Sequence, residues 1–221
     1  MHFIRRALPL AGLVGLVLML LTGSVFAQSR LVIASGTDAV TLDAHRITDS
    51  PSATVSEHIT ETLFELTPDG RIVPNLVESY EVSEDGRVWT LHLREGIRFH
   101  DGTPFNAAAV KYNLDRILDP ANAVTFRFLI SPVTSVDVVD EYTVRLTTAA
   151  PFAPILAHLT HSSIGMLSPA AVERYGQDIA RNPVGTGPFR FKEWVRNDRI
   201  VLERNPDYWG EPPQVDEIVF R

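Results

Sequence analysis

The chain reads Asn182-Pro-Val-Gly-Thr-Gly-Pro-Phe-Arg-Phe-Lys-Glu-Trp194 and, shortly afterwards, Val201-Leu-Glu-Arg-Asn-Pro-Asp-Tyr-Trp-Gly-Glu-Pro212. Residues 189–195 and 199–203 flank a turn at Asn197-Asp198 and predict a hairpin. Gly185 and Gly187 predict a tight crossing of two backbone segments, because glycine has no Cβ to keep another segment away. The aromatic pair Tyr208-Trp209, set between prolines, is expected to pin a loop to the core.

The residues before this stretch alternate between strand and helix patterns. Asp85-Gly86 separates the strand-like residues 79–82 and 88–93, and Asp140-Glu141 separates 133–139 and 142–147, so two more hairpins are expected. A short buried strand is expected at 31–35. Helices are predicted at 51–65 with Ser50 as N-cap, from Asn106 to Asp119, at 154–160 and at 169–175.

The order of these elements indicates a mixed α/β fold. Consecutive hairpins argue against a purely parallel sheet, and the strands argue against a helical bundle. The last residues, 215–221, have strand composition, with Ile218 and Phe220 on one face, and stop without a turn or polar tail. We expect an exposed, unfinished strand here and interpret the chain as truncated.

The first 27 residues have the pattern of a cleaved signal peptide. Arg5 and Arg6 precede a 15-residue apolar run, and Val25-Phe26-Ala27 offers a cleavage site. A retained membrane anchor is the alternative, but a spanning helix needs about 20 apolar residues. With no cysteine there is no disulfide and no lipid anchor, so a soluble periplasmic protein is expected. Cleavage leaves 18 basic and 27 acidic residues, which argues against nucleic acid as a partner.

No enzyme signature is evident in the sequence. His158 and His161 form an H-x-x-H pair without a third metal ligand, and no G-x-S-x-G elbow is present. A phosphate loop is disfavoured at Gly185-Thr-Gly187, because Pro188 lacks a donor and a strand follows. No catalytic residue, metal or cofactor is therefore predicted.

Several motifs resemble those of one family. They are Leu42-Asp43, Asp69-Gly70, Pro74-Asn-Leu76, Glu84-Asp-Gly86, Leu93-Arg-Glu-Gly96, Phe99-His-Asp-Gly102, Pro104-Phe105, Pro183-Val-Gly-Thr-Gly-Pro-Phe189 and Asn205-Pro-Asp-Tyr-Trp-Gly210. Together they are similar to the extracytoplasmic solute-binding proteins of family 5, the dipeptide, oligopeptide and nickel receptors of ABC importers. The resemblance implies a type II periplasmic-binding-protein fold (cluster C), with two lobes that close on ligand. It also implies that residues 28–221 are most of the first lobe and that the second lobe is absent.

The same resemblance implies which residues face the ligand. Thr37, Asp38 and Ala39 match the loop whose backbone pairs with an extended peptide, and Phe126-Arg127 and Ser162-Ser163 match two further segments that face the cleft. The groups that hold the charged ends of a peptide belong to the missing half. The implied partners are a small peptide or similar solute and the permease subunits of the transporter, and a monomer is expected.

Other functions stay open on the sequence alone. A secreted peptide hydrolase could draw catalytic groups from the missing half, and the chain could instead be a non-functional fragment or an interaction module. Within the binding class, nickel, haem, glutathione and sugar ligands are alternatives to peptides, although nickel would prefer a local His or carboxylate set that is not found.

Overall fold

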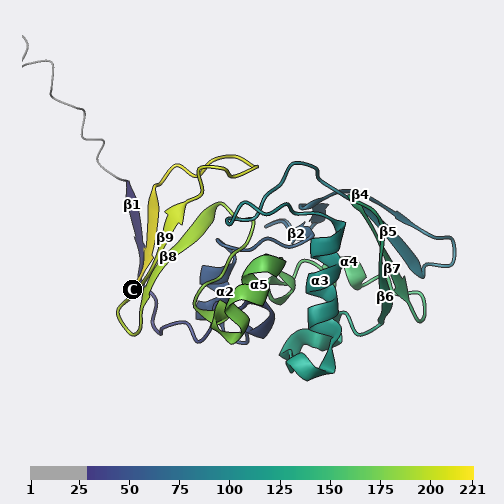
Figure 1. Ribbon diagram of the computed structural model, residues 1–221, viewed down its shortest axis with the longest axis horizontal. Coiled ribbons are helices and arrows are strands. Elements are labelled where there is room, and N and C mark those ends of the chain that lie inside the picture. Colours follow the sequence, from purple (N-terminus) through teal and green to yellow (C-terminus); the bar gives the residue numbers. More distant parts are fainter. Residues whose placement is uncertain (1–28) are drawn as a thin grey trace, which may run out of the picture.

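The computed structural model describes residues 29–221, so the predicted signal peptide, residues 1–27, lies outside the described part. Two four-stranded sheets lie at opposite ends of an elongated molecule, with helices between them (Figure 1). The first sheet has the order β1 (Arg30–Ile33), β10 (Glu217–Phe220), β9 (Arg199–Arg204) and β8 (Phe189–Val195). The second has the order β4 (Val77–Val82), β5 (Val88–Leu93), β7 (Thr143–Thr148) and β6 (Val133–Asp140). A separate hairpin joins β2 (Phe64–Leu66) to β3 (Ile72–Pro74).

Short helices connect the two sheets. They are η2 (Ala44–Arg46), α2 (Ser50–Ser56), α3 (Ala107–Leu118), η3 (Pro120–Asn122), η4 (Thr125–Leu129), α4 (Ile155–His158), η5 (Ser162–Ile164), α5 (Pro169–Tyr175) and η6 (Gly176–Ala180). The three predicted hairpins are confirmed, and so is the helix that Asn106 caps through its side chain. Since β1 and β10 run parallel while the other pairs are antiparallel, the predicted mixed α/β class is also confirmed.

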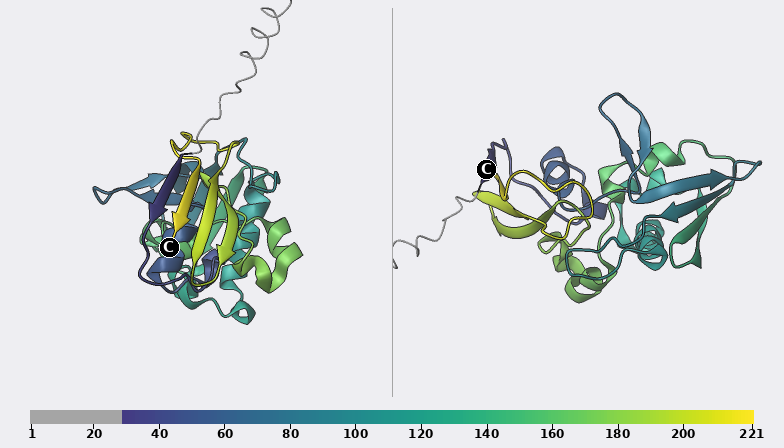
Figure 2. Two further views of the ribbon diagram at one scale, coloured as in Figure 1. Left: turned by 90° about the vertical axis from the view of Figure 1, so that its left-hand side faces the viewer. Right: turned by 90° about the horizontal axis from the view of Figure 1, so that it is seen from above.

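The burial predicted for the two strands at the chain's ends is wrong. β1 was expected to be buried but is an edge strand, and Leu31 and Val32 are 46% and 56% exposed. β10 was expected to be exposed but lies between β1 and β9 with all four residues buried. Figure 2 (left) shows these strands side by side. The pairing joins residues 187 positions apart, such as Arg30 and Glu217, which no local pattern reveals.

The predicted helix over residues 51–65 is too long, and its predicted N-cap is also wrong. α2 ends at Ser56, and Asp49, not Ser50, accepts the capping hydrogen bond from the Ser52 N–H. The helix stops because the next carbonyls have other partners. The carbonyl oxygens of His58 and Ile59 accept hydrogen bonds from the Phe189 and Gly187 N–H groups.

The predicted tight crossing is confirmed at this same place. A Cβ on Gly185 would lie 2.1 Å from the Ile59 carbonyl oxygen, and one on Gly187 would lie 2.7 Å from the His58 oxygen. His100 supports the crossing, because its N–H and its ring Nε2 contact the carbonyl oxygens of Gly185 and Gly187 at 2.9 Å. Strand β8 therefore begins next to the place where residues 58–60, residues 185–187 and His100 contact one another.

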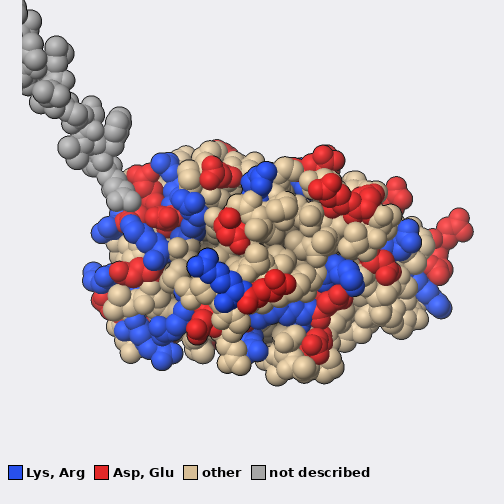
Figure 3. Space-filling model, viewed as in Figure 1, with Lys and Arg blue, Asp and Glu red and all other residues tan. Residues whose placement is uncertain are grey.

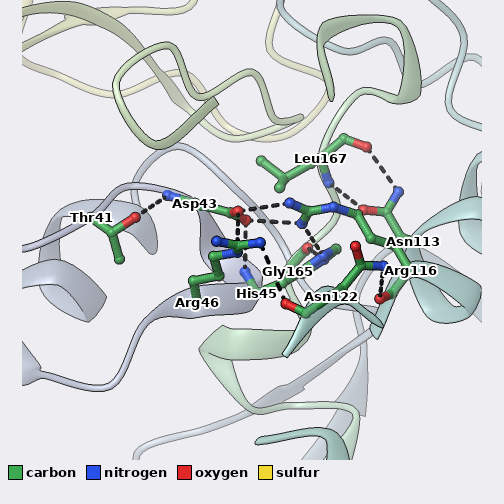
Figure 4. A network of polar contacts seen from close by, with 9 residues as sticks. All are labelled: Thr41, Asp43, His45, Arg46, Asn113, Arg116, Asn122, Gly165 and Leu167. Carbon is green, nitrogen blue, oxygen red and sulfur yellow. Dashed lines mark hydrogen bonds and ion pairs between the residues drawn. The ribbon is translucent and has the colours of Figure 1, made fainter. Parts of the chain in front are cut away.

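A buried polar network ties η2 to α3 (Figure 4). Arg116 donates to both Asp43 carboxylate oxygens at 2.9 and 2.7 Å and to His45 Nδ1 at 2.6 Å. The other His45 nitrogen, Nε2, donates to the Gly165 carbonyl oxygen at 3.0 Å. Burial, together with the Arg116 charge, lowers the His45 pKa to about 4. The ring is therefore neutral at physiological pH and joins an arginine to a backbone carbonyl.

Candidate ligand-binding site

A pocket of about 290 Å³ lies beside the loop that follows β1. The predicted residues Thr37, Asp38 and Ala39 all line it, and Asn197 of the β8–β9 turn and Phe220 of β10 form other parts of the wall. Because β1 and β10 are parallel, their carboxyl ends lie at the same edge of the sheet, where ligands commonly bind in α/β folds. The first predicted segment therefore lies at the rim of a real pocket.

The backbone of this loop has free donors. Ser35 N–H donates to the Arg221 carbonyl oxygen, and the Val40 N–H donates to Ser52 Oγ at 2.9 Å. Between these anchors, the N–H groups of residues 36–39 donate to no other residue within 29–221. Backbone N–H groups without a partner in the protein are available to a ligand, so this run can take its carbonyl or carboxylate oxygens.

The side chain of Asp38 is already engaged. Both carboxylate oxygens accept from Trp194 Nε1 at 3.1 Å, and Oδ2 also accepts from the Asn197 N–H at 2.9 Å. The guanidinium of Arg181 lies over the Trp194 ring, 5.1 Å from its centre. The loop after β1 is thus connected to the β8–β9 turn through one carboxylate.

The other predicted residues gather around His161. The Phe126 ring contacts the His161 ring at a tilt of 40° with centroids 4.7 Å apart, and Ser162 follows directly in η5. Ser163 is fully buried, and its Oγ hydrogen bonds to His161 Nδ1 at 2.8 Å. Arg127 donates to the Leu118 carbonyl oxygen at 3.4 Å and forms no ion pair with the described residues. Phe126 and Ser162 are therefore both neighbours of His161, whereas the buried Ser163 orients the His161 ring through a hydrogen bond.

His161 and Ser162 also line a second pocket, of about 660 Å³. Its other walls carry the carboxylates of Glu57 and Glu65 and the hydroxyl of Tyr208. This pocket shares no lining residue with the pocket beside the loop of residues 36–39, called the Thr37 loop below. The two predicted segments therefore form separate contact areas on this chain.

Sequence reasoning missed Glu61, which organises the aromatic loop. Its carboxylate accepts from Thr186 Oγ1 at 2.7 Å, Tyr208 Oη at 2.9 Å and Trp209 Nε1 at 2.8 Å. Burial raises the pKa of Glu61, although these three donors act in the opposite direction. The prediction that Tyr208 and Trp209 pin a loop is confirmed. No local signal reveals their acceptor, which lies 147 and 148 residues away.

The paired histidines have structural partners. His158 Nδ1 contacts the Leu129 carbonyl oxygen, and His161 Nδ1 contacts Ser163. Within residues 29–221, no three His, Cys, Asp or Glu side chains are grouped so that they could hold a metal ion. Nor does any helix in that range have the length and apolar character needed to cross a bilayer.

Comparison with known proteins identifies the family. The family model of bacterial extracellular solute-binding proteins, family 5, matches residues 71–221. The chain belongs to this family. Its predicted resemblance and its type II periplasmic-binding-protein fold are therefore both confirmed, and members of the family are binding proteins.

The relatives and solved structures that this chain resembles are longer than it is. The glutathione-binding protein GsiB of Escherichia coli K12 is 40% identical over 219 residues, which are 98% of this chain and 43% of that protein. The Helicobacter pylori periplasmic binding protein DppA in complex with peptide STSA is 31% identical with a TM-score of 0.81, over 88% of this chain and 43% of the other. AgaA of A. tumefaciens R10 in complex with agropinic acid is 34% identical with a TM-score of 0.82, over 87% and 40%. This chain spans less than half the length of each.

Proposed function

We propose that this chain forms the first lobe of the solute-binding component of an ABC importer, which captures small peptides or glutathione-like solutes for uptake. In this proposal residues 1–27 direct export and are removed, and the protein works as a monomer in the periplasm. Its partners are the solute and the permease subunits in the membrane. Capture involves no chemistry, because the ligand only has to favour the closed arrangement of two lobes over the open one.

The free N–H groups of residues 36–39 carry this proposal. A peptide in extended form presents a carbonyl oxygen on alternate sides of its backbone, so it can add to such a loop as a strand adds to a sheet edge. Backbone pairing of this kind does not depend on the side chains of the ligand. The loop therefore suits a receptor that accepts peptides of varied sequence.

The second contact area supplies the side-chain contacts. Phe126 offers an aromatic face, Arg127 a cation without an ion-pair partner among the described residues, and Ser162 a hydroxyl. An apolar face with a few polar groups is the usual lining of a small-molecule site. In the proposed complex, Thr37, Asp38 and Ala39 contact or shape the ligand backbone, while Phe126, Arg127 and Ser162 contact its side chains and Ser163 supports His161.

The relatives favour peptide-like substrates. GsiB is named for glutathione, and the DppA structure holds the peptide STSA. The AgaA structure holds agropinic acid, which shows that this fold also accommodates a ligand of another kind. We therefore place di- and oligopeptides and glutathione first among the candidate substrates of this chain.

Nuclear magnetic resonance titration of the purified chain tests the proposal. Glutathione, a dipeptide and a tetrapeptide are expected to shift the amide signals of residues 36–39 in the millimolar range, since a single lobe makes only part of the contacts. The exposed turn at residues 84–86 is an internal control whose signals should stay in place. Unchanged signals at 36–39 with every peptide would overturn the proposal, as would the appearance of cleaved peptide in the sample.

A further inference from the structure

The loop after β1 has one side-chain anchor in its centre. Its ends are held by the Arg221 carbonyl oxygen and by Ser52 Oγ. Between these ends, the only described hydrogen bonds from residues 36–39 to another element are those of the Asp38 carboxylate. Ser35 Oγ also donates to the Thr37 carbonyl oxygen at 2.7 Å, and Ala39 packs in the core beneath the loop. The Asp38 carboxylate is the contact that joins the middle of the loop to the β8–β9 turn.

The partners of Asp38 belong to the first sheet and its β8–β9 turn. Trp194 lies on β8, packs against the core formed by α2 and the first sheet, and is covered by the Arg181 guanidinium. Asn197 occupies the β8–β9 turn in the left-handed region, with φ 59°. A carboxylate that accepts from an indole and a turn amide is fixed in both position and orientation. It links the middle of the loop to strand β8 and to the turn that follows it.

We propose that Asp38 is a positioning residue, whose carboxylate clamps residues 36–39 onto the β8–β9 turn and so aims their N–H groups at the ligand. The inference rests on the proposed function and changes the part that Asp38 plays in it. The alternative is that the Asp38 charge binds the ammonium group of a peptide directly. The three hydrogen bonds already made by its two oxygens favour the clamp. A clamp improves binding because a loop that is already ordered loses less entropy when ligand arrives.

The clamp can be tested without ligand. The sequence contains three tryptophans, so the indole N–H region of a ¹⁵N spectrum should show three signals, and the Trp194→Phe variant identifies the one from Trp194. In Asp38→Asn, one charged oxygen is replaced by an amide, so the Trp194 signal should move together with the amides of residues 36–39. The signals of Trp89 and Trp209 should not. An unmoved Trp194 signal would refute the clamp.

Affinity measurements separate the clamp from direct recognition. The purified chain is titrated with a tripeptide and with its N-acetylated form. A clamp predicts that Asp38→Asn and Trp194→Phe each weaken both ligands by a similar factor, roughly tenfold, and that the double variant is no worse than either single one, because both remove the same contact. Glu203→Gln, which removes a carboxylate from β9 of the same sheet, should bind as wild type.

The remaining outcomes are distinct. If Asp38→Asn weakens only the tripeptide with a free amino group and Trp194→Phe has no effect, Asp38 binds the ligand directly and the clamp is wrong. If both variants bind both peptides as tightly as wild type, the positioning role is wrong while the proposed function stands. If the wild-type chain binds neither peptide, the proposed function fails and the positioning role fails with it.

Discussion

At the scale of single residues, the crossing at Gly185 makes the sharpest stability prediction. In Gly185→Ala the new Cβ would meet three backbone atoms, the Ile59 carbonyl oxygen at 2.1 Å and the Ile59 carbonyl carbon and Thr60 Cα at 2.8 Å. Backbone atoms cannot rotate away as a side chain can, so the two segments must separate. We expect the free energy of unfolding to fall by about 3 kcal/mol, at the upper end of the usual cost of overpacking. Urea-induced unfolding followed by tryptophan fluorescence measures it.

Gly36→Ala is the matched control for this prediction. A Cβ on Gly36 would have no neighbour within 4 Å, and its backbone is not in the left-handed region. The control should stay within about 0.5 kcal/mol of wild type. Equal unfolding midpoints for the two alanine variants would show that the crossing does not require glycine.

His100, on the other side of the crossing, makes stability depend on pH. Burial lowers its pKa to about 4, against about 6.5 in an unfolded chain. Between these values the unfolded chain binds the extra proton, so the contribution of His100 to stability is complete above about pH 6.5 and is lost as the pH falls toward 4. The slope reaches at most about 1.4 kcal/mol per pH unit. In His100→Gln the fall in unfolding free energy from about pH 7 to about pH 5 should be smaller.

A second histidine variant serves as the comparison for His100. His92 lies half-buried on β5, where it pairs with Thr143 of β7, so His92→Gln leaves the crossing intact and controls for the loss of a histidine elsewhere in the molecule. Glu61 has a raised pKa and an opposite effect on pH dependence, but it is present in all three proteins and cancels in the comparison. If the unfolding free energies of wild type and His100→Gln changed in parallel with pH, the lowered pKa of His100 would be contradicted.

Single residues were predictable from the sequence where the cause was local. The glycine crossing and the pinning role of Tyr208 and Trp209 both follow from residue type and immediate neighbours. Glu61 was not predictable, because an isolated glutamate in a helix-like stretch carries no sign that three donors will converge on it. The engagement of Asp38 by Trp194 was hidden for the same reason, since 156 residues separate the two.

At the scale of elements, the start of α2 distinguishes two possible caps. The Asp49 carboxylate accepts from Ser52 N–H at 2.9 Å and from Ser52 Oγ at 2.8 Å, and Ser52 Oγ in turn accepts from the Val40 N–H. Asp49→Ala should therefore cost about 1 to 2 kcal/mol, the usual range for a lost N-cap. Ser50→Ala should cost only a few tenths of a kcal/mol, because Ser50 is exposed in the first turn. Thermal and urea unfolding of both variants measure the difference, and a larger loss in Ser50→Ala would restore the cap expected from sequence.

Hairpins and helices differ in how much of them the sequence reveals. A hairpin is decided by a turn and its two flanks, so all three were predicted with small errors at their ends. The end of α2 was not predictable. The carbonyl oxygens of residues 58 and 59 do not continue the helix, because they accept hydrogen bonds from the N–H groups of residues 189 and 187, far along the chain. The burial of β10 and the exposure of β1 likewise depend on long-range pairing.

At the scale of the whole molecule, the mixed fold was predictable, but the long-range strand pairing that builds the candidate pocket was not. The pocket of the Thr37 loop exists because the first strand and the last strand pair side by side and bring loop, turn and strand end together. The resemblance named the loop, but only the folded chain shows that its N–H groups are free and its carboxylate is engaged. Figure 3 shows Lys and Arg gathered with acidic residues over the first sheet, where β1 pairs with β10.

Glu217 of β10 joins strands β1 and β8 through its side chain. Its side chain is 1% exposed and accepts from Arg30 at 2.7 Å and from Lys192, so β1, β10 and β8 share one carboxylate. We expect Glu217→Ala to lower the free energy of unfolding by about 2 kcal/mol, less than for a fully buried pair, because Arg30 and Lys192 are half-exposed and water can solvate them afterwards. Glu203→Ala, which breaks a 3.6 Å exposed pair with Arg190, should change it by less than about 0.5 kcal/mol. Equal effects of the two substitutions in urea unfolding would contradict a stabilising role of the Glu217 carboxylate between β1, β10 and β8.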